Sequence, residues 1–109
     1  MVNENKIQEM QILEQSLQNI FLQKQAFQME LSETESALNE IEKAGEEIFK
    51  IIGQLMIKTD KSKVKDELLN KKKILDMRLK TLQKQETALS NKIEEIREEI
   101  MKSVNKKEK

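Results

Sequence analysis

Residues 48–58, IFKIIGQLMIK, decide the fold of this 109-residue chain. They combine β-branched and other large apolar side chains, and Gly53 interrupts them once. Such residues favour β-strands, and a glycine between two short apolar runs is typical of a hairpin turn. The stretch therefore predicts a β hairpin over about residues 46–58. A short buried helix or a simple dimer contact is the alternative, which Gly53 and its β-branched neighbours disfavour.

The two flanks of the hairpin predict long α-helices, over about residues 4–43 and 61–104, with a frayed tail at 105–109. The chain has no proline, and both of its glycines lie near its centre, so neither flank contains a strong helix breaker. Apolar residues recur in both flanks in alternating steps of three and four, which is the seam of a coiled coil. The seam positions are Met10, Leu13, Leu17, Ile20, Phe27, Leu31, Leu38 and Ile41 in the first flank, and Leu68, Leu75, Leu79, Leu82, Leu89, Ile93, Ile96 and Ile100 in the second.

The two seams match when the chain is folded back on itself. Seam positions whose residue numbers add to 106 form one layer each, and Leu31 then meets Leu75. We therefore expect a mainly α fold: a single domain, residues 1–109, that forms a long antiparallel coiled-coil hairpin around the short β hairpin. Lys24 and Glu86 fall in adjacent layers, and we predict that they lie close together across the seam. They either fix the register or extend to water as separate side chains.

The predicted β hairpin is apolar on both faces, and one coiled coil meets it only at its end. A lone two-stranded ribbon is marginally stable in water, and its free edges pair readily with other chains. The sequence therefore predicts oligomerisation through the hairpins, with their edges closed into a barrel platform. The residues expected to carry this assembly are Ile48, Phe49, Ile51, Ile52, Gly53, Leu55, Met56 and Ile57.

Apolar residues also gather near the two chain termini, at the free end of the predicted coiled coil. Layers at such an end have neighbours on one side only, so they open more readily than inner layers. Several such ends, each of them weak, can hold one non-native chain together. The alternative is that these residues are ordinary seam positions. The residues concerned are Ile7, Met10, Ile12, Leu13, Leu17, Ile93, Ile96, Ile100, Met101 and Val104.

The composition argues against catalysis. The chain has no cysteine and no histidine, which excludes the usual zinc sites and Cys–His or Ser–His nucleophiles. It has no glycine-rich phosphate loop, so we expect no enzyme activity and no cofactor. The carboxylates Glu94, Glu95, Glu98 and Glu99 fit a solvated helix face better than a metal site. Met1 leads directly into a charged segment, and no apolar run is long enough to span a membrane, so we expect a cytoplasmic protein without membrane contact.

The net charge is zero but unevenly distributed. Residues 1–44 carry eight acidic and three basic side chains, and residues 45–109 carry twelve acidic and seventeen basic ones. Nine of those bases lie between positions 61 and 84. Nucleic-acid binding is one interpretation, but the chain lacks tyrosine and tryptophan for base stacking. We favour the other interpretation, in which the bases are counter-charges to the acidic first helix.

Three stretches resemble the β-type subunit of prefoldin: QKQAF with ETESALNEI within residues 23–41, the hairpin IFKIIGQLMIK, and DELLNKKKILDMRLKTLQKQE at residues 66–86. The resemblance covers nearly the whole chain and is closest to archaeal members. A single hairpin between arms of equal length is its most diagnostic feature. The lysine-rich start of the second helix departs from the pattern and leaves its capping residue open.

The resemblance implies an ATP-independent chaperone. Prefoldins of this kind are hexamers of two α and four β subunits, whose hairpins form a platform and whose arm tips capture unfolded proteins for a group II chaperonin. On this chain, the hairpin would be the assembly element, the apolar tips would be the client site, and Lys106, Lys107 and Lys109 would be candidates for chaperonin contact. The alternative function is a structural coiled-coil adaptor without chaperone activity.

Overall fold

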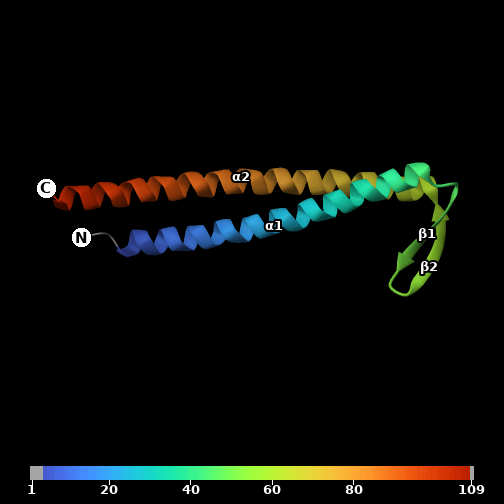
Figure 1. Ribbon diagram of the computed structural model, residues 1–109, viewed down its shortest axis with the longest axis horizontal. Helices are drawn as coiled ribbons and strands as arrows, with labels where there is room; N and C mark the ends of the chain where they lie inside the picture. The colour runs from blue at the N-terminus through green and yellow to red at the C-terminus, as the bar shows by residue number, and fades with distance from the viewer. Residues whose placement is uncertain (1–3, 109) are drawn as a thin grey trace. The chain divides into compact units, whose positions relative to one another are not determined.

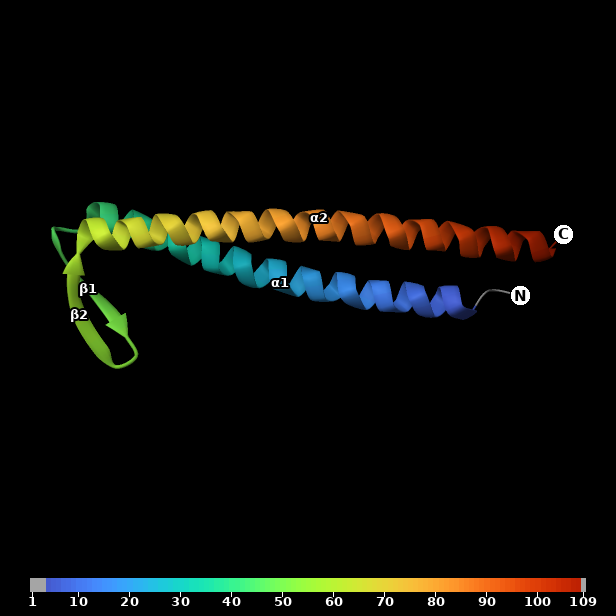
Figure 2. The ribbon, with the colours of Figure 1, turned by 180° about the vertical axis from the view of Figure 1, so that it is seen from behind.

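The computed structural model describes residues 4–108, with side chains up to Asn105. Helix α1 spans Glu4–Lys43, strand β1 spans Glu47–Ile52, strand β2 spans Leu55–Asp60, and helix α2 spans Lys61–Glu108 (Figure 1). The same order of elements is seen from behind in Figure 2. The predicted mainly α fold, with a short β hairpin between two long helices, is confirmed.

Helix α2 is longer than the sequence predicted. Residues 105–108 were expected to be a frayed tail, but the helix continues through them to Glu108. These four residues, NKKE, contain no glycine or proline, and lysine and glutamate are good helix formers. Nothing in the local sequence therefore ends the helix at Val104. At the other end, α2 begins at Lys61, so Asp60 stands at the capping position.

The β hairpin is a two-stranded antiparallel sheet with a tight two-residue turn. Ile52 pairs with Leu55, and the register continues residue by residue to Glu47 and Asp60. Gly53 has a φ of 61°, and Gln54 has no positive φ, a combination that fits a type II′ turn. This turn favours glycine at its first position, because a side chain there is strained at positive φ. The glycine that marked the hairpin in the sequence is thus required by its turn.

The chain forms two compact units, residues 4–25 with 80–108, and residues 26–79. In the first unit, Lys6 forms an ion pair with Glu99, and Lys24 forms one with Glu86, so the two helical segments are antiparallel. The buried apolar side chains of this unit all come from the predicted seam: Ile20, Leu82, Ile93 and Ile96. Burial of this continuous stripe holds the two helical segments together.

The second unit contains the hairpin and the adjoining parts of both helices. Glu42 pairs with Lys65, and Glu35 pairs with Lys72, so these segments are antiparallel too. The residue numbers in each of these pairs add to 107, close to the predicted sum of 106. Lys65 donates a hydrogen bond to Glu42 and lowers the pKa of its carboxyl below the ordinary value. These pairs lie on the surface, so the seam beneath them supplies most of the stability.

The seam of the second unit buries one polar residue together with its apolar ones. Ile41 and Leu75 are buried, and so is Thr34, which stands in the seam between Leu31 and Leu38. The Thr34 hydroxyl donates a hydrogen bond to the carbonyl oxygen of Glu30, 2.8 Å away and one helical turn earlier. A threonine can be buried in a helix at little cost when its hydroxyl bonds the backbone in this way.

The polar layer of the first unit has the predicted partners. Lys24 Nζ lies 3.2 Å from Glu86 Oε2 and 2.7 Å from Gln83 Oε1. The side chains of Lys24 and Glu86 are only 17% and 25% exposed. Their proximity is therefore confirmed, and two separate side chains extending to water are ruled out. Gln83 was not foreseen, because it lies outside the seam.

This polar layer yields a stability prediction. We expect Glu86→Leu alone to lower the free energy of unfolding by about 1–2 kcal/mol, because the Lys24 ammonium then stays partly buried without its counter-ion. Replacing both residues by leucine should restore that loss and raise Tm, since an apolar layer packs well in a seam. Urea unfolding followed by circular dichroism measures the first effect. If the double variant also keeps a single oligomer mass, the pair does not fix the register.

Candidate functional site

Both faces of the β hairpin are exposed in the single chain. On one face, Ile51 and Met56 are direct cross-strand partners and are 69% and 67% exposed. On the other face, the directly paired Ile52 and Leu55 are 52% and 66% exposed. Phe49 and Ile57 are also exposed, and only Ile48 is partly covered. The hairpin therefore presents a large apolar surface that water covers unless another chain does.

Charged side chains surround this apolar surface at the base of the hairpin. Lys50 Nζ lies 3.1 Å from Glu67 Oε2, which connects β1 to α2. Lys58 Nζ lies 2.9 Å from Glu47 Oε1, which connects the two strands on the opposite face. Beyond these charged residues, the last two cross-strand pairs before the turn, Ile51–Met56 and Ile52–Leu55, are entirely apolar. These two pairs are therefore the part of the hairpin best suited to apolar contact with another chain.

The ten residues predicted for the arm end lie in the first unit, but they differ in exposure. Ile12 and Met101 are 64% and 56% exposed. Ile93 and Ile96 are buried at 5% and 3% exposure, as ordinary seam residues would be. The others are partly covered: Ile7, Met10, Leu13, Leu17, Ile100 and Val104. Only part of this set is available for contact while the seam is closed.

The proposed chaperonin contacts lie beyond what the structure describes in detail. Lys109 is outside the described residues, and the side chains of Lys106 and Lys107 are outside them too. Their role stays a prediction from the resemblance.

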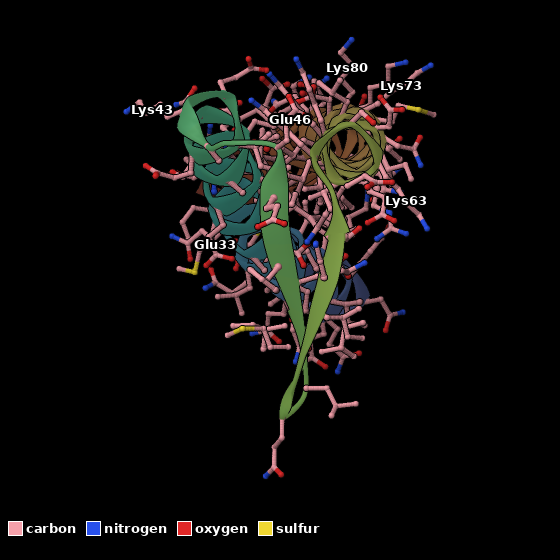
Figure 3. The ribbon with its side chains drawn as sticks, turned by 90° about the vertical axis from the view of Figure 1, so that its right-hand side faces the viewer. Glu33, Lys43, Glu46, Lys63, Lys73 and Lys80 are labelled. Atoms are coloured by element: carbon pink, nitrogen blue, oxygen red, sulfur yellow. The ribbon has the colours of Figure 1, made fainter. Side chains whose placement is uncertain are left out.

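The lysines at the start of α2 are divided between two roles. Lys65 and Lys72 pair with acids of α1, as a counter-charge requires, and Lys61 Nζ donates a 2.9 Å hydrogen bond to the carbonyl oxygen of Ala44. That bond places a cation just beyond the C-terminal end of α1, where the helix dipole favours positive charge. Lys63 and Lys73, in contrast, lie on the side of α2 away from α1 (Figure 3). The counter-charge interpretation thus holds for only part of the basic stretch.

A cation–π contact also joins the two helices in the second unit. The Arg78 guanidinium lies 5.6 Å from the centroid of the Phe27 ring. Arg78 is exposed, and its guanidinium lies over the ring of a seam residue, an arrangement in which a cation–π attraction is favourable. The heptad pattern identified Phe27, but no sequence pattern indicated Arg78 as its partner.

Sequence reasoning missed a hollow of about 260 Å³ in the first unit. Its lining comes from one face of α1 and one face of α2: Glu14, Leu17, Gln18, Phe21, Glu86 and Ser90. The small side chain of Ser90 and the polar Glu86 stand in α2 near Leu17 of α1, so the space beside the seam is incompletely filled. The combination of a polar seam residue with a nearby serine is the signal that could have indicated it.

The acidic run in α2 behaves as a solvated face. Glu94, Glu95, Glu98 and Glu99 are all exposed. Glu94 pairs with Arg97, with Oε2 and Nη1 3.2 Å apart, and Glu99 pairs with Lys6. Within the part of the chain that the structure describes, no group of three or more carboxylates is placed to hold a metal ion. Neither α1 nor α2 contains, over the described residues, an apolar stretch long enough to cross a membrane.

Comparisons with known proteins place the chain in a family. The family model for prefoldin subunits matches residues 4–107. Prefoldin subunit beta of Thermococcus onnurineus is 44% identical over 89 residues, which cover 80% of this chain and 77% of that protein. The corresponding subunit of Pyrococcus furiosus is 40% identical over 89 residues, covering 80% and 76% of the two chains.

A solved structure agrees with these sequence matches. The crystal structure of the prefoldin beta subunit from Thermococcus strain KS-1 superimposes with a TM-score of 0.85 at 34% identity, covering 94% of this chain and 96% of that one. The match covers nearly the whole chain, so it includes the β hairpin whose two faces are exposed. The chain belongs to the prefoldin subunit family, and within that family it is similar to the archaeal β subunits.

Proposed function

We propose that this chain is a β-type subunit of an α₂β₄ prefoldin hexamer, and that the hexamer holds unfolded proteins without ATP and delivers them to a group II chaperonin. Membership of the family already implies assembly with other prefoldin subunits and a chaperone role rather than an enzymatic one. The observation that carries the proposal is the exposed apolar hairpin, which needs neighbouring chains on both faces. Its edges close into a barrel platform in the hexamer, and the site of action is the cytoplasm.

Client capture is assigned to the arm end of the first unit. Ile12 and Met101 offer apolar contact while the helices remain paired. Ile93 and Ile96 join them only when the end layers of the coiled coil open, because they are buried in the closed state. The affinity for a client therefore has two levels. It is weak while only the exposed residues make contact, and it increases when the end layers of the coiled coil open. The four copies of this chain in an α₂β₄ hexamer provide four such ends, and their multivalent binding compensates for the weakness of each.

The burial of Ile93 and Ile96 is also what an adaptor without chaperone activity would show. Such a protein would use the hairpin for assembly and keep its seam closed along its length. The two functions differ in what the assembled oligomer does to a denatured protein. A holdase slows the aggregation of that protein, and an adaptor does not.

A substitution at the arm end separates the two functions. We expect Ile12→Ser with Met101→Ser to reduce suppression of aggregation by roughly half or more, because each substitution removes an exposed apolar contact from every arm that this chain forms. The measurement is light scattering of a denatured protein diluted into the assembled oligomer. The double variant should keep its helix content and mass, since neither side chain is in the core.

Leu69→Ser provides the matched control, because Leu69 is 47% exposed on α2 but lies in the second unit. It should suppress aggregation like the unaltered chain. Removal of residues 1–10 and 97–109 should abolish suppression while the hexamer stays intact. If suppression survives this trimming, clients bind elsewhere, and if the unaltered oligomer never suppresses aggregation, the adaptor function stands.

A further inference from the structure

We propose that the hollow beside Leu17 and Phe21 is a second client-binding site, which takes one large apolar side chain from a client segment that also carries a lysine or arginine. The inference rests on the proposed chaperone function and adds a substrate class to it. The site differs from the arm-end set, because five of its six lining residues are not among the arm-end residues.

The hollow has a physical cause in the two facing sequences. Glu86 occupies a seam position where an apolar residue would otherwise fill the layer. Its carboxylate accepts hydrogen bonds of 3.2 and 3.3 Å from Lys24 Nζ, which directs it toward that ammonium group. Ser90, one turn further along α2, is too small to fill the remaining space. Lys24 Nζ also donates a 2.7 Å hydrogen bond to Gln83 Oε1, so the polar side chains of Gln83 and Glu86 in α2 are both bonded to Lys24.

The size and lining of the hollow suit one apolar side chain. Leu17 is partly covered and Phe21 is 47% exposed, so both present apolar surface that water now contacts. The hollow is open to solvent, and its volume of about 260 Å³ is enough for one large apolar side chain to lie against Leu17 and Phe21. Covering an aromatic ring and a leucine with an apolar side chain removes this surface from water and favours binding.

The charges around the hollow favour a cationic neighbour in the client. Glu14 and Glu86 are both in its lining, whereas no basic residue is. Glu86 is neutralised by Lys24, but Glu14 is exposed and forms no ion pair in the described part of the chain. A lysine or arginine next to the bound apolar residue can therefore pair with Glu14, while an acidic client segment is repelled. An apolar segment with a basic neighbour fits both features.

The test uses the assembled oligomer and two fluorescent peptides with the same Leu-Phe centre, one flanked by lysines and one by glutamates. We expect the lysine-flanked peptide to bind more tightly in fluorescence anisotropy. Ser90→Phe fills the hollow and should weaken binding of the lysine-flanked peptide by about fivefold or more. Asn91→Phe adds the same ring at the next exposed position of α2, outside the lining, and should leave binding unchanged.

A charge variant tests the basic neighbour separately. Glu14→Gln should lower the affinity of the oligomer for the lysine-flanked peptide by roughly two- to fivefold, which is the effect of losing one exposed ion pair. The affinities for the two peptides should then be closer to each other. Binding that is unchanged by Ser90→Phe, or tighter binding of the glutamate-flanked peptide, would overturn the inference. A change in oligomer mass with Ser90→Phe would overturn it too, since the hollow would then hold another subunit. Suppression of aggregation by these variants is scored separately, so the chaperone function can survive the loss of this site.

Discussion

Replacing Ile51 by lysine and Met56 by glutamate should dissociate the oligomer into folded monomers. The two residues are direct cross-strand partners and are 69% and 67% exposed in the single chain. Burying one such side chain between subunits contributes about 1.5–3 kcal/mol to association. Loss of both side chains should therefore lower the association constant of each subunit contact by roughly a hundredfold or more. The introduced charges are opposite in sign and face each other across the strands, so the hairpin itself is preserved. Light scattering coupled to size-exclusion chromatography should show a mass near 12.8 kDa.

The matched control removes similar apolar surface from outside the hairpin. Leu69→Lys with Ile74→Glu alters two α2 residues that are 47% and 42% exposed. This variant should keep the mass of the unaltered assembly, and both variants should keep their helix content by circular dichroism. An oligomer that survives the hairpin substitutions would show that the interface lies elsewhere. Dissociation by the control would mean that apolar surface anywhere on the chain supports assembly.

Leu75→Ala should cause a large loss of folding stability. Leu75 is 3% exposed and lies in the seam of the second unit. A buried leucine shortened to alanine loses its transfer free energy and leaves a cavity, which together cost about 2–5 kcal/mol. Two helices provide little other packing around that layer, so neighbouring side chains cannot readily fill the space. Urea unfolding at a fixed protein concentration, followed by circular dichroism, measures the change.

Leu69→Ala is the control for this loss, because Leu69 lies on the same helix but is 47% exposed. It should change the free energy of unfolding by less than about 1 kcal/mol, as surface substitutions usually do. A similar loss in both variants would mean that the seam was assigned to the wrong face of α2. The fixed concentration matters, since assembly itself stabilises the folded chain.

The elements that could be predicted are those with local signals. The steps of three and four placed Leu75, Leu82 and Ile96 in the seam, and all three are buried. The β-branched run around Gly53 placed the hairpin, because only a tight turn needs that glycine at positive φ. The fold-back sum placed Glu86 near Lys24, since the register of two seams fixes the neighbours of every polar interruption.

The features that could not be predicted depend on side-chain geometry or on weak end signals. Gln83 reaches Lys24 from outside the seam, and Lys61 binds the carbonyl of Ala44 across the hairpin base. Heptad spacing carries no information about such contacts. Helix α2 ends beyond Val104 because no breaker residue follows it, and charged composition alone had suggested fraying. The degree of burial within the arm end was also not predictable from spacing, since Met10 and Ile96 are both seam positions, yet Met10 is only partly covered and Ile96 is buried.

The solution mass of the unaltered chain tests most directly whether neighbouring subunits cover the hairpin. Sedimentation equilibrium over a range of protein concentrations, with and without a prefoldin α subunit, gives that mass. We predict a species several times heavier than the 12.8 kDa chain, in which amide hydrogens of residues 48–57 exchange slowly. The claim that neighbouring subunits cover the hairpin would be contradicted by a single 12.8 kDa species at every concentration, with rapid amide hydrogen exchange in the hairpin even when the α subunit is present.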